Sequence, residues 1–334
     1  MILRSWVRNG IFIASLSQSL IGVSLVWDKI LLRQPRIGNL LNYIFWLGAI
    51  SVFGLAVIPF GFSFPRLWII AIAFLSGILD LIATYFYYAV LKTGEASGTV
   101  ALMGGFSPVA TVLFACVLLA QPLVRGQEVA FVILVVAGFI MFFAEHARFR
   151  LPVLLPRVAA TSVLFGLENV LQKVVFNHTG FVSGFVFISL GTFCGAMFLL
   201  VRRSWRTQIF TASGEAPPSS RAGYFANRFV SGLGSFLVFY AINLTSPAIV
   251  DALSGLRYVI VFLGVLAFTR LKPAILSEDF RPAIFAAKFV STAMVAVGLA
   301  VLAMHSGTGG GQMAGGSYGV AWGLARAEPG IRRH

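Results

Sequence analysis

Charged residues are scarce in this sequence of 334 residues: Asp, Glu, Lys and Arg make up 11% of it, while 58% of the residues are hydrophobic. A soluble domain carries about a quarter of its residues as charges and arranges its apolar residues in stripes. Here the apolar residues form continuous blocks of about twenty, the length that crosses a hydrocarbon core about 30 Å thick. The sequence therefore predicts an integral, multi-pass membrane protein with the lipid bilayer as its solvent.

Cysteine and histidine are also rare, with two and four residues respectively. Cys116 and Cys194 both lie inside apolar blocks, which excludes a disulfide framework and a Cys-x-x-Cys metal site. The histidines lie at or beyond the ends of the blocks, and no zinc-protease, nucleophile or phosphate-loop motif is present. We therefore expect no metal, no cofactor and no enzymatic activity; an intramembrane enzyme is the least favoured alternative.

Acidic residues are outnumbered by basic ones, 11 to 25, which gives a formal net charge of +14. In a soluble protein this charge would point to nucleic acid. Most of the basic residues, however, lie in short loops between apolar blocks, where Lys and Arg anchor helix ends and bias topology. We expect no nucleic-acid partner.

The predicted fold class is an all-α membrane protein of about ten transmembrane helices. The first block lacks a cleavage signature and is interpreted as a span rather than a removable signal. The longest internal loop, Arg202–Ala222, is expected to be mobile, and the Gly-rich segment 306–334 to be disordered. The predicted spans are Gly10–Trp27, Leu40–Phe60, Leu67–Val90, Gly98–Ala120, Val129–Ala144, Val158–Phe176, Val182–Val201, Gly223–Ile242, Ala248–Phe268 and Ile284–Met304.

Two short segments recur at nearly constant offsets. Gly22–Lys29 at the end of the first span matches Gly166–Lys173 in the sixth, with Gly, Val and Lys at the same places. Ala101–Gly104 in the fourth span matches Ala252–Gly255 in the ninth. The offsets, 144 and 151 residues, suggest two copies of a five-helix unit.

An odd number of helices returns the chain on the other side of the membrane, so a second copy must be inverted. We assign residues 1–147 to the first repeat and 148–305 to the second, followed by the Gly-rich tail 306–334. Loop charge agrees, because the loop after the first span contains three basic residues and its counterpart near Asn177–Gly180 contains none. Inverted repeats are the architecture of many secondary transporters. Duplication without alternating access remains the alternative.

The stretch Tyr88–Phe142 combines an apolar and aromatic end of the third span with a short turn and a fourth span. That fourth span has a central Ser107-Pro108-Val109, and Gln121-Pro122-Leu123 follows its last residue. The segment Phe239–Val250 looks like the same unit in the second half. The pattern resembles the EamA-like branch of the drug/metabolite transporter superfamily.

The resemblance covers about residues 10–305. It implies a ten-helix inverted repeat with a central cavity, and proton-coupled or exchange transport of small metabolites. The sequence departs from the family at two places. Gln121 stands where the family often has Glu, and Leu256–Tyr258 stands where the fourth span has Phe106–Pro108.

Charged side chains inside spans cost roughly 2.5–3.5 kcal/mol each at the bilayer centre, so they usually face a partner or a water-filled cavity. The third span carries Asp80 on one helical face with Ser76, Thr84 and Tyr87. Asp80 could carry a proton, face a cationic solute or bond to a neighbouring helix. Tyr85 is predicted as an orienting contact, although the tyrosines at this span end also suit an interfacial belt.

The sixth span places Glu168, Asn169, Gln172 and Lys173 within one and a half turns. A helix cannot expose this many polar side chains to lipid without a large cost, so we expect this face to line a cavity. Lys173 could instead extend to the membrane interface.

Arg228 lies in the predicted eighth span, and Asp251 and Arg257 lie in the ninth. Arg257 is near mid-span. It is either the binding point for a carboxylate or phosphate or the partner of Asp80, Glu168 or Asp251. Asp251 could be an interfacial residue or a helix cap.

The predicted function is a gradient-driven secondary transporter that exports or exchanges a small organic metabolite across the plasma (bacterial inner) membrane. A lipid flippase and a channel-like pore are the alternatives, although no filter segment is present. The expected partners are the solute and the bilayer, with a homodimer left open. The predicted substrate- or proton-binding residues are Asp80, Glu168, Arg257, Asn169, Gln172, Tyr85, Asp251 and Arg228.

Orientation in the membrane stays open. The side of the odd-numbered loops carries 14 Lys and Arg outside the spans, and the side of the termini carries 7. By the positive-inside rule this places the termini outside, whereas the family resemblance implies termini inside.

Overall fold

The structure, a computed structural model, describes residues 10–34, 36–93, 96–120, 125–146 and 151–271, together with ten positions between 286 and 301. Helices, turns and loops make up this part of the chain, and it contains no strand. Its elements up to residue 271 are α2 (Gly10–Arg33), α3 (Leu40–Ile50), the 3-10 helix η1 (Ser51–Phe60), α4 (Leu67–Thr93), α5 (Ala96–Leu119), α6 (Arg125–His146), α7 (Leu151–His178), α8 (Phe181–Phe198), α9 (Arg203–Glu215), α10 (Pro218–Leu244), α11 (Pro247–Ala252) and α12 (Gly255–Leu271).

Seven helices within the described residues are long and apolar enough to cross a membrane. They coincide with the predicted spans one to three and six to nine. The predicted fourth and fifth spans fall on α5 and α6, in which the described side chains include the apolar stretches Phe106–Leu119 and Glu128–Ile140. The tail 306–334 and most of the predicted span 284–304 lie outside the described residues. The chain is an all-α protein whose apolar helices suit an integral, multi-pass membrane protein.

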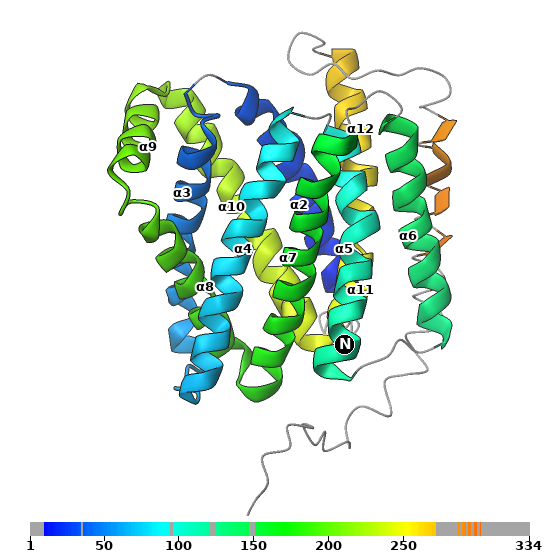
Figure 1. The fold of residues 1–334 in the computed structure, drawn as a ribbon, viewed down its shortest axis with the longest axis horizontal. Coiled ribbons are helices and arrows are strands. Elements are labelled where there is room, and N and C mark those ends of the chain that lie inside the picture. The colour runs from blue at the N-terminus through cyan, green and yellow to red at the C-terminus, as the bar shows by residue number, and fades with distance from the viewer. Residues whose placement is uncertain are drawn as a thin grey trace, which may run out of the picture.

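Successive long helices run in alternating directions (Figure 1), and the most extensive packing joins α2 to α10 and α4 to α7 and α8. α2, α4 and α8 run toward the end of the bundle where α9 lies, whereas α5, α7 and α10 run away from it. We call these two ends the α9 end and the opposite end. α2 and α7, which begin the two predicted repeats, therefore run in opposite directions.

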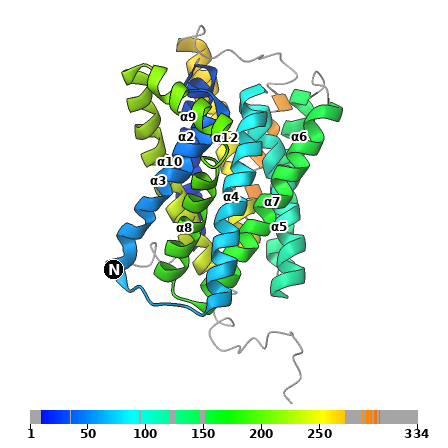
Figure 2. The same cartoon turned by 60° about the vertical axis from the view of Figure 1, so that its left-hand side comes forward.

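The helix α9 replaces the mobile loop that the sequence predicts over Arg202–Ala222. It lies at the edge of the bundle and packs against α3 (Figure 2). Ile209 and Ala212 are buried on its inner face, whereas Phe210 is 48% exposed. Two buried apolar residues one turn apart are enough to hold this short polar segment as a helix.

α4 and α8 cross closely because each carries a glycine at the contact. A Cβ on Gly77 would lie 2.1 Å from the carbonyl oxygen of Ile188, and one on Gly191 would lie 2.5 Å from that of Phe74. The hydroxyl of Thr192 donates to the carbonyl oxygen of Gly77 at 3.1 Å. Small residues and hydroxyl bonds of this kind hold helices together where lipid removes the hydrophobic driving force.

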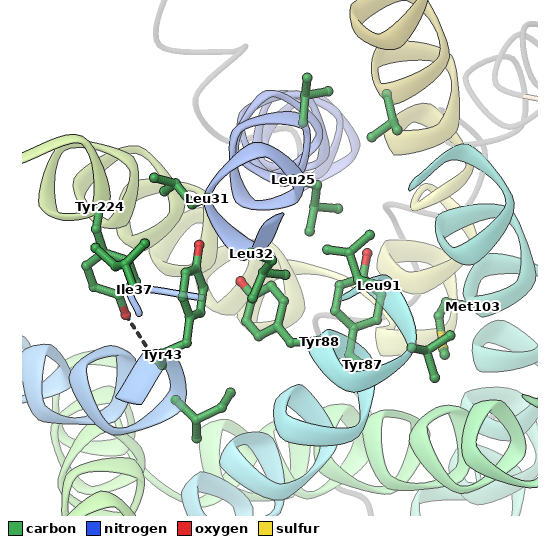
Figure 3. Packing of buried hydrophobic residues seen from close by; sticks show 14 of the residues in the cluster. Leu25, Leu31, Leu32, Ile37, Tyr43, Tyr87, Tyr88, Leu91, Met103 and Tyr224 are labelled. Carbon is green, nitrogen blue, oxygen red and sulfur yellow. Dashed lines mark hydrogen bonds between the residues drawn. The ribbon is translucent and has the colours of Figure 1, made fainter. Parts of the chain in front are cut away.

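The largest apolar cluster lies toward the α9 end and includes an unusual number of tyrosines (Figure 3). Tyr43 meets Tyr224 edge to face at 4.7 Å and Tyr88 at 5.2 Å between ring centroids. Tyr224 donates its hydroxyl to the carbonyl oxygen of Tyr43 at 2.7 Å. These rings come from α3, α4 and α10, so they tie both halves of the chain together at this end.

Two of the spans depart from regular α-helix. The second continues from α3 into η1, which ends at Gly61 with φ of +111°. The ninth is interrupted between α11 and α12, where the amides of Ser254 and Arg257 donate to the carbonyls of Asp251 and Ser254, three residues back, at 2.9 Å. Short 3-10 geometry inside a helix often marks a functional hinge.

Candidate functional site

The polar side chains that lie within the bundle form two groups. One surrounds the interruption between α11 and α12, and we call it the central group. The other lies nearer the α9 end, and we call it the Asp28 cluster. The central group consists of Gln18, Ser107, Thr111, Glu168, Asn169, Gln172, Asp251 and Arg257; the Asp28 cluster consists of Asp28, Tyr43, Tyr88, Asn227 and Arg228.

Asp251, at the end of α11, is 8% exposed and held by hydroxyl groups of α5. Its Oδ2 accepts from Ser107 Oγ at 2.8 Å and from Thr111 Oγ1 at 2.5 Å. The side chain of Asn169 on α7 lies near this carboxyl group. Asp251 therefore lies inside the bundle and joins α11 to α5, rather than being an exposed residue at a helix end.

Glu168, on α7, is 3% exposed. Its Oε1 accepts from the amide of Gln172 one turn along the same helix. Its acidic neighbours are Asp80 and Asp251. The polar face that the sequence predicts on this span thus points into the bundle, and it brings a second carboxyl group to the central group.

Arg257, at the start of α12, is half-buried. Its Nε donates to Oε1 of Gln18 on α2, and the amide of Gln18 donates to the carbonyl oxygen of Val250 at 3.0 Å. Among the described residues, no acceptor contacts the outer nitrogens Nη1 and Nη2, and no carboxylate lies within ion-pair distance. Among the described residues Arg257 therefore forms no direct ion pair with Asp80, Glu168 or Asp251, although Asp251 lies close enough for the two charges to interact.

Two further polar groups near Arg257 lack partners within the described chain. The hydroxyl of Tyr87 on α4 is buried without a hydrogen bond, and this ring lies close enough to Arg257 for the two charges to interact. Ser254 Oγ, in the helix interruption, is likewise buried and unpaired. Buried polar groups are nearly always hydrogen-bonded, so unpaired ones beside a cation call for a ligand or water.

Asp80 and Tyr85, both on α4, lie less deeply. Asp80 is half-buried and accepts from Thr84 Oγ1 at 3.5 Å, the outer limit of a hydrogen bond. Tyr85 packs edge to face on Phe86 at 5.5 Å. The structure therefore places Asp80 beside Glu168 as an acidic neighbour, while the contacts of Tyr85 are aromatic.

Asp28 is fully buried and accepts four hydrogen bonds, three of them from tyrosine or asparagine. The donors are Tyr43 OH and Arg228 Nη2, Asn227 Nδ2 at 2.5 Å, and Tyr88 OH at 2.7 Å. The guanidinium of Arg228 also lies over the rings of Tyr43, Tyr88 and Tyr224. Arg228 is thus paired with an acid and walled by aromatic rings, unlike Arg257.

Two buried lysines bind the ends of neighbouring helices. Lys29, 2% exposed, donates to the carbonyl oxygen of Leu91 at 2.6 Å in the last turn of α4. Lys173, 9% exposed, donates to those of Ile242 and Asn243 at 2.9 and 3.0 Å in the last turn of α10. These carbonyls have no partner within their own helix, and the helix dipole favours a cation there. Lys173 therefore does not extend to the interface.

Asp28 and Lys29 were missed because the predicted first span ends at Trp27, whereas α2 continues to Arg33. The repeat match contains the signal that could have found them. Aligning Gly22 with Gly166 pairs Asp28 with Gln172 and Lys29 with Lys173, both of which the sequence places inside a span.

No protein-family model matches this chain, and no curated protein matches it. A solved structure described only as "Crystal structure of protein" is similar to it, with a TM-score of 0.58 and 16% sequence identity. The alignment covers 88% of this chain and 95% of the other. At this identity the similarity shows a shared fold and nothing about activity.

Proposed function

We propose that the chain is a secondary active transporter that carries a small organic solute by alternating access. The observation that carries this proposal is Arg257, a guanidinium inside a span whose outer nitrogens have no partner in the described chain. A charge in a span is costly unless it meets a partner or a water-filled cavity, so an arginine in this state suits the binding of a solute that supplies an acceptor. A solute that carries a carboxylate, phosphate or carbonyl group supplies one.

The helix interruption beside Arg257 supports the same proposal. Secondary transporters commonly build their solute sites from discontinuous helices, because the interrupted backbone and nearby polar groups can contact the solute. The unpaired hydroxyls of Tyr87 and Ser254 add two more groups that a solute can satisfy. We propose that Glu168 is the group that exchanges a proton. Its side chain bonds to Gln172, and its charged neighbours are the acids Asp80 and Asp251.

Two inverted five-helix repeats, as in the EamA-like branch of the drug/metabolite transporter superfamily, belong to this proposal. Equivalent contacts at repeated positions support it. A Cβ on Gly22 would lie 3.0 Å from Ile260 Cβ, and one on Gly166 would lie 2.8 Å from Ala110 Cβ. The two glycines are 144 residues apart and their partners Ala110 and Ile260 are 150 apart, close to the repeat offsets. Both contacts join the first span of one repeat to the fourth span of the other.

The helix pairing follows the same relation. α2 packs on α10, and its counterpart α7 packs on α4, the counterpart of α10. The sequence has no nucleotide-binding motif, so we propose that an ion or solute gradient across the plasma or bacterial inner membrane supplies the driving force.

A binding experiment on the purified protein tests the role of Arg257. Amino acids, amines, nucleosides and sugar phosphates are screened for those that raise the melting temperature. Arg257→Gln is compared with Arg221→Gln, which removes an exposed cation from α10. We expect the stabilising solute to protect the wild type and Arg221→Gln but not Arg257→Gln. Equal protection of all three would place the solute elsewhere.

A flux experiment then separates a carrier from a pore or a flippase. Proteoliposomes loaded with the stabilising solute are diluted into a trace of the labelled compound. A carrier exchanges solute for solute, so the label accumulates transiently against its gradient. Simple equilibration without this overshoot would refute the carrier and favour the channel-like alternative.

A further inference from the structure

We propose that Lys29 and Lys173 are a pair of latches, each of which holds one end of the solute pathway closed. The proposal rests on the alternating-access function above and adds to it the residues that control the two ends. Each lysine is buried, each donates to the last turn of a neighbouring helix, and the two bonds lie far apart in the bundle.

The two latches occupy equivalent positions of the proposed repeats. Lys29 and Lys173 are 144 residues apart, the offset of the matching segments around them. Their acceptors Leu91 and Asn243 are 152 residues apart, close to the offset of 151 found between the fourth and ninth spans. In both repeats the first span therefore binds the end of the third span by the same type of contact.

Each latch bridges a seam with little other packing. α2 packs chiefly on α10 and α12 and meets α4 only along a narrow contact. α7 packs chiefly on α4 and α5 and has a narrower contact with α10. A bond across such a seam is well placed to resist separation of the helices, because few other contacts have to be broken when they part.

The two seams open toward different sides. The C-terminal ends of α2 and α4 lie at the α9 end of the bundle, and those of α7 and α10 lie at the opposite end (Figure 1). Lys29 therefore closes the α9 end and Lys173 closes the opposite end. Alternating access requires one end to open while the other stays closed, and a lysine at each end can exchange its carbonyl partners for water as its seam parts.

The two latches are built differently. At the α9 end the hydroxyl of Tyr88 on α4 also donates to Asp28 on α2, at 2.7 Å. The residue that matches Asp28 in the second repeat is Gln172, whose amide donates to Glu168 within its own helix. Among the described residues, the opposite end has no matching tyrosine–carboxylate bond, but Lys173 itself donates twice across its seam, to the carbonyl oxygens of Ile242 and Asn243.

Side-specific labelling of a cysteine in the central group tests the latches without any solute. The background carries Cys116→Ala and Cys194→Ala, and Ser254→Cys adds a thiol at the helix interruption, where the native hydroxyl makes no hydrogen bond. A membrane-impermeant thiol reagent is applied to one side of oriented proteoliposomes at a time. The rate of labelling then reports how often the pathway is open to that side.

The test variants are Lys173→Met alone and Lys29→Met combined with Tyr88→Phe. We expect Lys173→Met to raise labelling from the opposite end, and the double variant to raise it from the α9 end. Each variant removes two hydrogen bonds across its seam, so each rise should be at least about tenfold, the change expected for losing a single charge-assisted hydrogen bond. Arg66→Gln and Arg221→Gln, which remove an exposed cation at either end, should label like the background.

Unchanged labelling in folded variants, or a rise from both sides in the same variant, would overturn the latches. If Lys173→Met does not purify as a monodisperse protein, Lys173→Gln serves in its place with the same expectation, and Lys173→Arg should restore the background rate. If the labelling rates change as expected but the protein shows no solute counterflow, the carrier function is refuted and the latches are retained. If the protein shows counterflow but the labelling rates do not change, the latches are refuted and the carrier function is retained.

Discussion

The buried pair of Asp28 and Arg228 makes the sharpest prediction about stability. We expect Arg228→Met to lower the free energy of unfolding by about 3–5 kcal/mol, because it leaves the Asp28 carboxylate buried without its counter-charge. Both side chains are at most 3% exposed, so water cannot replace the lost partner. By contrast, Tyr88→Phe removes one hydroxyl bond to the same carboxylate, and such bonds between membrane helices contribute only about 0.6–1.7 kcal/mol.

A double-mutant cycle with Asp28→Asn separates the pair from its surroundings. Removing both charges leaves neither side chain as an uncompensated ion, so the combined variant should lose much less stability than the sum of the two single variants. The measurement is unfolding of the purified protein by increasing sodium dodecyl sulfate in mixed micelles, followed by circular dichroism. Losses that add to within about 0.5 kcal/mol would show that the two charges are not coupled.

Two further predictions concern glycine contacts and a surface ion pair. Gly77→Ala should lower stability by about 1–3 kcal/mol, because its Cβ would meet a carbonyl oxygen of α8 at 2.1 Å. Gly232→Ala, with no atom within 4 Å of the new Cβ, should be neutral or stabilise by up to about 1 kcal/mol, which the same detergent titration checks. Glu215→Gln should change stability by less than about 0.5 kcal/mol, since the Arg36–Glu215 pair at 3.2 Å has both side chains more than half exposed. A larger loss there would contradict the assignment of this pair as a solvated surface contact.

The positions of the helices could be predicted from sequence because lipid imposes one dominant requirement, a block of apolar residues long enough to span it. The ends of the helices could not. Asp28 and Lys29 interrupt the apolar block, and a block-based prediction stops before them. The structure continues α2 through both, because Asp28 finds Arg228 and Lys29 finds the end of α4. Those partners lie 200 and 62 residues away, and hydropathy contains no information about them.

The central group shows the same difference between what the sequence could predict and what it could not. The sequence placed Glu168, Asp251 and Arg257 inside spans, since any charge within an apolar block is visible. It could not decide whether Arg257 pairs with an acid, because that depends on how α2, α5 and α7 bring their side chains around α12. The structure assigns the hydroxyls of α5 to Asp251 and leaves the outer nitrogens of Arg257 unpaired. The short helix α9 was missed for a related reason, as its two buried residues need a neighbouring surface that the sequence does not show.

The contrast between Arg228 and Arg257 argues for a division of tasks along the bundle. Both are guanidinium groups inside predicted spans, so both bear a similar cost of insertion. At Arg228 an acid and three aromatic rings offset that cost permanently, which suits a part of the structure that must hold two halves together. At Arg257 the described residues engage one nitrogen, by a neutral amide, and Asp251 lies near without a direct ion pair, so they offset less of the cost. The incompletely paired charge of Arg257, at the interrupted helix, suits the binding of a mobile acceptor. The fully paired charge of Arg228, near the α9 end, suits a contact that holds that end closed.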